Sequence, residues 1–436
     1  MEKCVKSQLT TFLDQNNIYT PTQFGFRKGH TTVHAQIAAT EIMYNHIKKN
    51  EICILVSLDL RKAFDTVNKN ILLEKLTWYN IDNSWFKSYL TNRPQFVDLN
   101  EKYSSMMEPI LSVPQGSVLG PLLFTLMIND LPLFIKYCKA VLFADDTQLL
   151  LGGKIEDLEE IIKKIEYDLE EVMKWMDKNG MGLNVDKTNF MVIGKKCVLN
   201  TLNEVNIKIK NTSIKRLDAI KCLGLTIDTN LEWTKHIEIM LRKANFKLKS
   251  LYPLKNMLNT ENRLIIINSY VLPILRYMIV LYLNTKDKNI KEIDKFVKKC
   301  GRFVFDYGKY DKVKLKISQE LKWLFPKYLY EYECLKLVYI IITKNFPHYF
   351  NDYLNLNETN VRATRNTNYV NRNNANDQSF KTKGSFLWTN LPDNIKSSVT
   401  LQIFKNKLNK LLIDKQTNDF TDLISDLSVL LENVNI

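Results

Sequence analysis

The chain has 436 residues, of which 45% are hydrophobic and 25% are charged, a balance that is typical of a globular protein and excludes a disordered one. Its 61 Lys and Arg residues exceed its 47 Asp and Glu residues by 14. The 7 cysteines form no C-x-x-C pair, which rules out a disulfide scaffold and argues against a zinc finger. The length predicts two or three domains, and the first residues lack the apolar stretch of a secretory signal.

The first half of the chain alternates strand-like and helix-like segments. Residues 52–60 are a continuous apolar run that ends at Asp59 and Leu60, and they predict a buried strand. Residues 140–151 hold two apolar runs around Asp145 and Asp146, which predicts a hairpin with carboxylates at its tip. We expect helices over 68–79, 117–131 and 156–179, and further strands over 190–194 and 222–228. This order is that of a ferredoxin-like βαββαβ unit.

Beyond residue 231 the strand signals fade. Helices are predicted over 233–255, 261–283, 290–305 and 328–343, residues 351–377 are rich in Asn, and residues 379–413 are patterned again. The most apolar stretch is 264–283, and Asn268, Pro273 and Arg276 interrupt it. A central arginine is costly inside a bilayer, so a pair of buried helices is favoured over a membrane span.

The basic excess lies in the second part of the chain. Residues 1–230 hold 28 Lys and Arg against 27 Asp and Glu, whereas residues 231–436 hold 33 against 20. No acidic residue occurs between Glu238 and Glu261, where 5 basic residues do. A long polyanion such as nucleic acid is a natural partner for that stretch. The alternative is a solvated helix face, and charge alone does not separate the two interpretations.

Three aspartates are candidates for chemistry. Asp59 ends one predicted strand, and Asp145 and Asp146 lie at the tip of the predicted hairpin. Adjacent strands would bring the three carboxylates to one sheet edge, where a divalent cation relieves their repulsion. Two Mg²⁺ ions in such a place can activate a 3′-hydroxyl and stabilise a leaving pyrophosphate. The pattern therefore predicts nucleotidyl transfer, whereas a solvated turn is the alternative for an isolated Asp-Asp pair.

Six short motifs follow one another with the spacing of a known family. They are QFGFR with GHTT (23–32), DLRKAFDTV (59–67), VPQGSVLGP (113–121), FADD (143–146), GLN with KT (182–188) and KCLG (221–224). With these motifs the chain resembles the reverse transcriptases of non-LTR (LINE-like) retrotransposons. Residues 270–277 resemble the thumb segment of these elements, and residues 385–405 with WTNLP resemble their C-terminal region. This last region disfavours a telomerase-like or organellar-intron polymerase.

The resemblance implies an α+β fold. It is a right-hand polymerase palm, a ferredoxin-like βαββαβ sheet with helices and partial fingers, followed by an all-helical thumb and C-terminal region. The implied domains are 1–229 (partial fingers and palm), 230–350 (helical thumb and connection), 351–378 (Asn-rich linker) and 379–436 (C-terminal helical region). The upstream endonuclease of the family and its first fingers motif, R-P-I, are expected to be missing.

The resemblance also implies residue roles, which rest on matching motif positions. Asp59 and Asp145 would hold two Mg²⁺ ions, with Mn²⁺ as a substitute, Asp146 in support and the Leu60 carbonyl as a further ligand. The nucleotide would be bound by Lys62, Ala63, Phe64, Gln115, Gly116 and Lys187. Template and primer would be bound by Arg27, Leu223, Gly224, Arg242, Lys243, Lys247 and Lys249. Phe64 would exclude a 2′-hydroxyl. The alternatives are core packing for Phe64, a surface position for Lys187 and a salt bridge for Arg27.

Two functions follow from the resemblance. The first is an RNA-directed DNA polymerase that uses an RNA template, a DNA primer and dNTPs, with neither zinc nor a membrane. The second is a catalytically silent, truncated remnant that only binds nucleic acid. A chromosomal target predicts a nuclear location. A cytoplasmic location, as a ribonucleoprotein, is the alternative, and secretion is not expected. The sequence does not predict the oligomeric state.

Overall fold

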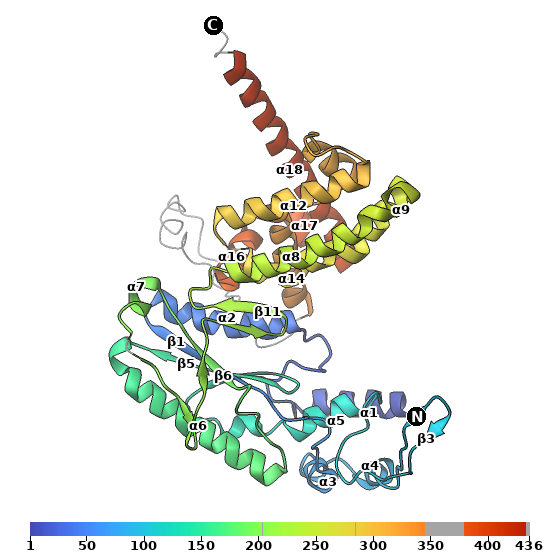
Figure 1. Cartoon of the computed structure of the whole chain (residues 1–436), viewed down its shortest axis with the longest axis vertical. Helices are drawn as coiled ribbons and strands as arrows, with labels where there is room; N and C mark the ends of the chain where they lie inside the picture. The colour runs from blue at the N-terminus through green and yellow to red at the C-terminus, as the bar shows by residue number, and fades with distance from the viewer. Residues whose placement is uncertain (203, 284, 345–378, 433–436) are drawn as a thin grey trace. The chain divides into compact units, whose positions relative to one another are not determined.

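The computed structural model describes residues 1–202, 204–283, 285–344 and 379–432, and it divides into two compact units (Figure 1). The units are Met1–Gly224 and Leu225–Ile436. The predicted linker at 351–378 lies outside the described residues. The predicted domain boundary at residue 229 stays a prediction beside the division at residues 224 and 225.

The first unit is built on a five-stranded sheet with the order β4-β5-β1-β6-β9. Its strands are β1 (Ile52–Leu58), β4 (Lys139–Phe143), β5 (Asp146–Gly153), β6 (Asn189–Ile193) and β9 (Lys215–Arg216). The central strand β1 is antiparallel to both β5 and β6, and β4 is antiparallel to β5. The first four strands are therefore arranged as in a ferredoxin-like fold, which confirms the predicted βαββαβ order.

Both faces of this sheet are covered by helices, which explains why β1 reads as an unbroken apolar run. A Cβ built on Gly153 would lie 3.1 Å from Ile161 of α6 (Leu158–Asn179), whereas one on Gly152 would lie 2.7 Å from His46 of α2 (Thr32–Lys48). Successive residues of a strand point to opposite faces. Figure 1 accordingly shows α6 and α2 on opposite sides of β1 and β5.

A buried carboxylate joins α6 to the start of β4. Asp168 is fully buried and accepts hydrogen bonds from the backbone N–H groups of Lys136 (2.9 Å), Tyr137 (2.9 Å) and Cys138 (2.6 Å). Three N–H donors replace the water that the charge gives up on burial. These bonds fix the residue at which β4 begins. The start of β4 in turn sets the position of the tip of the β4–β5 hairpin.

The remaining helices and short strands of the first unit surround this sheet. They are α1 (Glu2–Gln15), α3 (Lys69–Trp78), α4 (Ser84–Leu90), α5 (Gly120–Met127), α7 (Lys196–Leu199), β2 (Asp98–Leu99), β3 (Lys102–Tyr103), β7 (Lys208–Ile209), β8 (Thr212–Ser213) and β10 (Ala219–Cys222), with 3₁₀ turns at Leu131–Phe134 and Ile155–Asp157. The helix expected over 68–79 and the amphipathic helix expected over 156–179 are confirmed by α3 and α6.

Two sequence predictions in this unit were wrong in extent. The helix expected over 117–131 runs only from Gly120 to Met127, because Ser117 turns the chain before it, its hydroxyl accepting from the Gly120 N–H (2.9 Å). The single strand expected over 222–228 is two strands, β10 and β11 (Leu225–Asp228). Leu223 and Gly224 between them adopt positive φ angles of 46° and 82°, which end the first strand in a turn.

The second unit is helical after β11, as predicted. Its helices are α8 (Thr234–Leu251), α9 (Thr260–Ile266), α10 (Leu272–Arg276), α11 (Ile279–Tyr282), α12 (Asp287–Phe305), α13 (Lys314–Lys316), α14 (Pro326–Lys344), α16 (Phe380–Thr389), α17 (Asp393–Lys396) and α18 (Leu401–Glu432), with a 3₁₀ turn at Tyr252–Met257 and π-helical turns at Ile267–Val271 and Ile317–Leu321. The single helix expected over 261–283 was wrong in extent, because Tyr277 is extended and Met278 takes a positive φ of 55°, so the segment is broken into short pieces. Among the residues described, no helix is both long and apolar enough to cross a bilayer.

Candidate active site

Asp59 is the residue directly after β1, and its backbone is held at both ends by the segment 184–188. Its carbonyl accepts from the Asn184 N–H (2.7 Å), and its N–H donates to the hydroxyl of Thr188 (3.4 Å). The side chain of Asp59 is half-buried. The segment that holds Lys187 is therefore attached directly to the backbone of the first candidate catalytic residue.

Asp145 and Asp146 lie at the tip of the β4–β5 hairpin, as the sequence predicts. Phe143 pairs with Asp146, and Ala144 takes a positive φ of 55° to make the turn. On the other side of β5, Thr147 pairs with Leu58 of β1. The pairing ends there, and this antiparallel register continued by one residue would bring Asp59 opposite Asp146. Residues opposite each other in such a pair have Cβ atoms roughly 5 Å apart, so the three aspartates share one edge of the sheet.

The hairpin tip is supported by a residue that the sequence did not single out, Gln23. Its amide is fully buried; Oε1 accepts from the N–H groups of Gly25 (2.7 Å) and Ala144 (3.0 Å), while Nε2 donates to the Ala144 carbonyl (3.4 Å). A Cβ on Gly25 would lie 2.2 Å from the Ala144 nitrogen, so only glycine lets this segment approach the turn. The motif QFGFR contains Gln23, but the family resemblance implies a role only for its Arg27.

The three carboxylates act on one another. Partial burial and the charge of Asp59 raise the pKa of Asp145, although its own backbone N–H opposes the shift. Partial burial, Asp145 and Asp59 likewise raise the pKa of Asp146. The charge of Asp59 thus makes both Asp145 and Asp146 harder to ionise, and such crowding of negative charge is what a divalent cation relieves.

The acidic edge fits Mg²⁺ bound together with a substrate better than a closed protein cage. Among the residues described, no three acidic, thiol or imidazole side chains converge closely enough to enclose a metal ion. Mg²⁺ usually takes one or two carboxylates and completes its octahedron with water and substrate phosphates. An open row of aspartates is consistent with that mode of Mg²⁺ coordination. The Leu60 carbonyl lies between two backbone bonds, Asn184 to Asp59 and Arg61 to Gly182 (2.7 Å), and takes part in neither.

The turn after Asp59 holds three of the predicted nucleotide residues, Lys62, Ala63 and Phe64. Lys62 is exposed with a positive φ of 43°, and Ala63 is buried. Phe64 is half-buried and stacks on Phe124 of α5, with ring centroids 4.4 Å apart and 24° between planes. The core-packing interpretation of Phe64 therefore holds for one face of its ring. The role of the other face stays a prediction.

Gln115, Gly116 and Lys187 are all exposed. Gln115 donates from Nε2 to Oδ1 of Asp65 (2.5 Å), which joins its loop to the turn after β1. Gly116 has a positive φ of 74°, and the space that a Cβ would occupy there is open to 4 Å. The exposure of Lys187 is compatible both with a phosphate contact and with the simple surface position that was its alternative.

Arg27 is engaged inside the protein. Its guanidinium donates to the carbonyls of Thr20 (2.9 Å) and Gln23 (3.1 Å) and lies over the ring of Tyr19, 4.6 Å from the centroid. These contacts hold the QFGFR segment in place. The observed role of Arg27 is structural, and the predicted template contact stays a prediction without support from this geometry.

The predicted primer and template residues of the second unit lie on α8. Arg242, Lys243 and Lys249 are exposed, and Phe246 between them is 75% exposed. Lys247 differs, because its ammonium lies 3.9 Å from the centroid of the Tyr270 ring. Basic side chains around a bare aromatic ring form a surface that suits nucleic acid. The other two predicted residues, Leu223 and Gly224, form the turn after β10.

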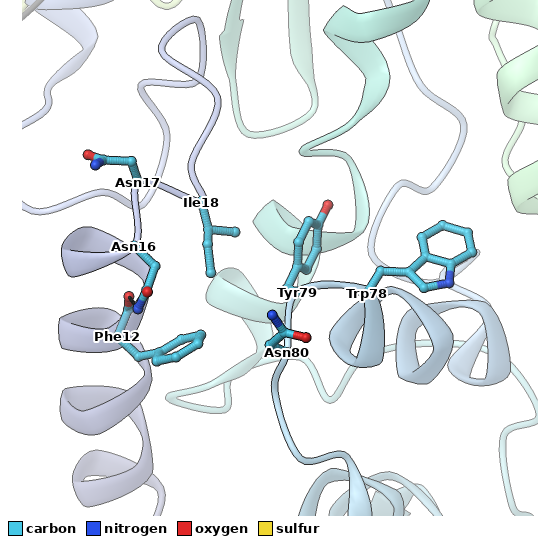
Figure 2. A pocket seen from close by; sticks show the side chains of 7 residues that line it. All are labelled: Phe12, Asn16, Asn17, Ile18, Trp78, Tyr79 and Asn80. Carbon is cyan, nitrogen blue, oxygen red and sulfur yellow. Dashed lines mark hydrogen bonds between the residues drawn. The ribbon is translucent and has the colours of Figure 1, made fainter.

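The described residues also contain a pocket of about 410 Å³. Its lining residues are separated in sequence from the candidate catalytic residues. Figure 2 shows it lined by the end of α1 and the end of α3. The lining residues are Phe12, Asn16, Asn17, Ile18, Trp78, Tyr79 and Asn80. None of them is a predicted site residue.

The comparisons with known proteins agree with this geometry. Residues 1–227 match the family model described as reverse transcriptase (RNA-dependent DNA polymerase). The chain belongs to the reverse transcriptase family. The resemblance to LINE-like reverse transcriptases is confirmed by two relatives from Drosophila melanogaster. The chain is 28% identical to the probable RNA-directed DNA polymerase from transposon X-element and 25% identical to that from mobile element jockey.

These relatives are longer than this reverse transcriptase chain. The X-element match covers 70% of the chain and 34% of the relative, and the jockey match covers 65% and 31%. The chain thus spans about a third of the length of the curated relatives that it matches. Among solved structures, it is similar to telomerase from Candida albicans in complex with a fragment of telomeric RNA, with 14% identity, a TM-score of 0.33, and coverage of 80% of this chain and 57% of that one. The residues that the family model matches, 1–227, hold the α+β sheet, and the described chain after them is helical.

Proposed function

We propose that this chain is the RNA-directed DNA polymerase of a non-LTR retrotransposon and that it adds dNTPs to the 3′-hydroxyl of a primer. The observation that carries the proposal is the gathering of Asp59, Asp145 and Asp146 at one sheet edge, where burial and the charge of Asp59 raise the pKa values of Asp145 and Asp146. The family match covers the unit that holds this edge. Metal-dependent nucleotidyl transfer is the chemistry that such an edge supports best.

In this proposal, Asp59 and Asp145 would hold two Mg²⁺ ions with Asp146 in support, and the ions would supply activation of the 3′-hydroxyl and stabilisation of the pyrophosphate. The chain's own groups would orient the substrates. The turn Lys62–Phe64 would lie against the triphosphate, and the fixed ring of Phe64 would leave no room for a 2′-hydroxyl. Lys187, attached to the Asp59 backbone through its segment, would neutralise charge on the departing pyrophosphate.

The proposed partners are an RNA template and a DNA primer. Arg242, Lys243 and Lys249 on α8 would contact phosphates of the duplex, and such contacts carry affinity without reading sequence. A chromosomal primer would place the reaction in the nucleus.

Primer extension tests the proposal directly. The full chain is incubated with a labelled DNA primer on an RNA template, the four dNTPs and Mg²⁺, and binding is followed separately by fluorescence anisotropy. We expect extension by the wild type and a loss of roughly 10³-fold in Asp145→Asn, because one isosteric change removes a charge that the transition state needs. Binding should remain.

The matched control is Asp98→Asn, which removes the charge of an exposed aspartate on β2 in the same unit. It should extend like the wild type. If the wild type binds the duplex and adds no nucleotide, the alternative of a silent nucleic-acid-binding protein is correct. If Asp145→Asn extends as fast as the wild type, the assignment of the catalytic edge is wrong.

A further inference from the structure

The segment after Asp59 is joined to the segment before α5 along most of its length. The Phe64 carbonyl accepts from the Val113 N–H (3.3 Å), and the Val67 carbonyl accepts from the Ser112 N–H (2.8 Å). At the far end, the ammonium of Lys69 donates to the Pro109 carbonyl (2.6 Å). These contacts fix the two main chains side by side, so the side chains at their ends are brought together reproducibly.

One side-chain contact, between Gln115 and Asp65, also joins these two segments. Nε2 of Gln115 donates to Oδ1 of Asp65 at 2.5 Å, between residues 50 positions apart in the sequence. The donor is neutral and the acceptor is a carboxylate, and bonds of this charge-assisted kind are shorter and stronger than neutral ones. Both side chains are exposed. A bond of this length between two exposed side chains fixes the orientation of one of them.

The fixed partner is the amide. A glutamine amide has a donor end and an acceptor end, and rotation by 180° exchanges them. A carboxylate accepts and does not donate, so the bond to Asp65 selects the rotamer whose NH₂ group faces residue 65. Oε1 and the second N–H of Gln115 are then held on defined sides of the amide.

We propose that Asp65 is a positioning residue that holds the Gln115 amide in one orientation for the incoming nucleotide. This inference rests on the proposed function, in which Gln115 and Gly116 meet the nucleotide. Asp65 itself does not touch substrate. Its carboxylate lowers the cost of binding by removing an amide rotation that the nucleotide would otherwise have to stop.

The first test is kinetic. Single-nucleotide extension by Asp65→Ala should show a dNTP KM raised roughly tenfold and kcat within about twofold of the wild type, because an interaction that only orders the binding site before chemistry acts on KM. Asp65→Asn keeps an oxygen that can accept from Gln115, so its KM should fall between those of Asp65→Ala and the wild type. A merely structural role would lower kcat and thermal stability together and would give no such rescue.

A double-mutant cycle shows whether Asp65 acts through Gln115. In a Gln115→Ala background, Asp65→Ala should change KM by less than about twofold, because the amide to be oriented is gone. If Asp65→Ala raises KM equally in both backgrounds, Asp65 acts independently and the proposal is wrong. Asp98→Ala is the matched control and should change KM in neither background.

The second test needs no activity. With ¹⁵N-labelled glutamine, the side-chain amide signal of Gln115, assigned by its loss in Gln115→Ala, should have one proton shifted downfield from those of an exposed glutamine such as Gln8, because that proton is held by the Asp65 carboxylate. Asp65→Ala should shift and broaden that signal, and the control should not. An unchanged Gln115 signal overturns the proposal even if the enzyme is active. A changed signal in a protein that never extends a primer upholds the positioning role and overturns the proposed function instead.

Discussion

The two units hold their candidate functional residues in different ways. In Met1–Gly224 the carboxylates are placed by hydrogen bonds from distant segments, Asn184 and Thr188 to Asp59 and Gln23 to the hairpin tip. In Leu225–Ile436 the candidates are exposed basic residues along one helix, α8. Fixed geometry serves bond formation, whereas distributed charge serves affinity for a polyanion. Substitutions in the first unit should therefore change rate and stability, and those in the second should change affinity and its dependence on salt.

Substitutions on α8 should sharpen the comparison between the two units most, because we expect their effect to be the largest. Replacing Arg242, Lys243 and Lys249 together by Ala should weaken primer–template binding about 100-fold near 0.1 M salt and lower the slope of log affinity against log salt by about three, because three phosphate contacts are lost. Anisotropy titrations at several salt concentrations measure both. The extension rate at saturating duplex should change little.

The matched control for α8 is another helix with exposed lysines. Replacing Lys163, Lys174 and Lys178 of α6 by Ala removes the same number of charges from the first unit. If this control weakens binding as much as the α8 variant, net charge and not a placed surface governs affinity, and the distinction between the units fails.

The next effect tests the fixed geometry of the first unit. Gln23→Ala should lower the free energy of unfolding by about 2 kcal/mol, because the buried Ala144 and Gly25 N–H groups lose their acceptor. Extension should slow as the hairpin tip loosens. Chemical denaturation measures the first and primer extension the second. The control is Gln8→Ala on the exposed face of α1; equal losses in both variants would show that Gln23 has no special role.

Phe64→Val addresses selectivity for the sugar. Shortening a ring that is held by Phe124 should open space without moving the turn, and the ratio of ribonucleotide to deoxyribonucleotide incorporation should rise roughly tenfold. Competition between rATP and dATP in single-nucleotide extension gives the ratio. Phe96→Val, at an exposed ring in the same unit, should leave it unchanged. An unchanged ratio in Phe64→Val would leave core packing as the only role of this ring.

The smallest effect concerns stability against pH. The pKa values of Asp145 and Asp146 are raised in the folded state, so the folded protein binds protons more readily than the unfolded chain. Stability therefore falls as the pH rises from the unfolded-state pKa of each aspartate to its folded-state pKa. Asp145→Asn removes part of this cost and should raise the unfolding temperature at neutral pH, without metal, by about 2 °C. Thermal unfolding between pH 4 and pH 7 measures it; a lower unfolding temperature in the variant would mean that the carboxylates do not repel.

Much of the fold was predictable because hydrophobic spacing reports it. The run of β1, the paired runs of β4 and β5 and the stripe of α6 each identified their own elements. The chain order of β1, β4, β5 and β6 then matched a known arrangement. The turn at Leu223 escaped prediction, because a leucine carries no signal of a positive φ and Gly224 after it was the sole mark of a turn.

The candidate site was predictable only in part. Asp59, Asp145 and Asp146 lie in motifs, and the register of β1 and β5 brings them to one edge. The contacts that hold the site join residues far apart in the chain, Gln23 to Ala144 over 121 positions and Asp65 to Gln115 over 50. No local pattern reports such pairs. For the same reason, the sequence could not separate Lys247, which lies over Tyr270, from its exposed neighbours.

The most direct measurement is the location of a bound divalent ion. Fe²⁺ substituted for Mg²⁺, with ascorbate and peroxide, cuts the polypeptide close to where the ion binds. We predict cuts near residue 59 and near residues 145–146, suppressed by excess Mg²⁺ and absent in Asp145→Asn. Cleavage confined to other segments, or unchanged in that variant, would contradict the assignment of the sheet edge as the catalytic centre.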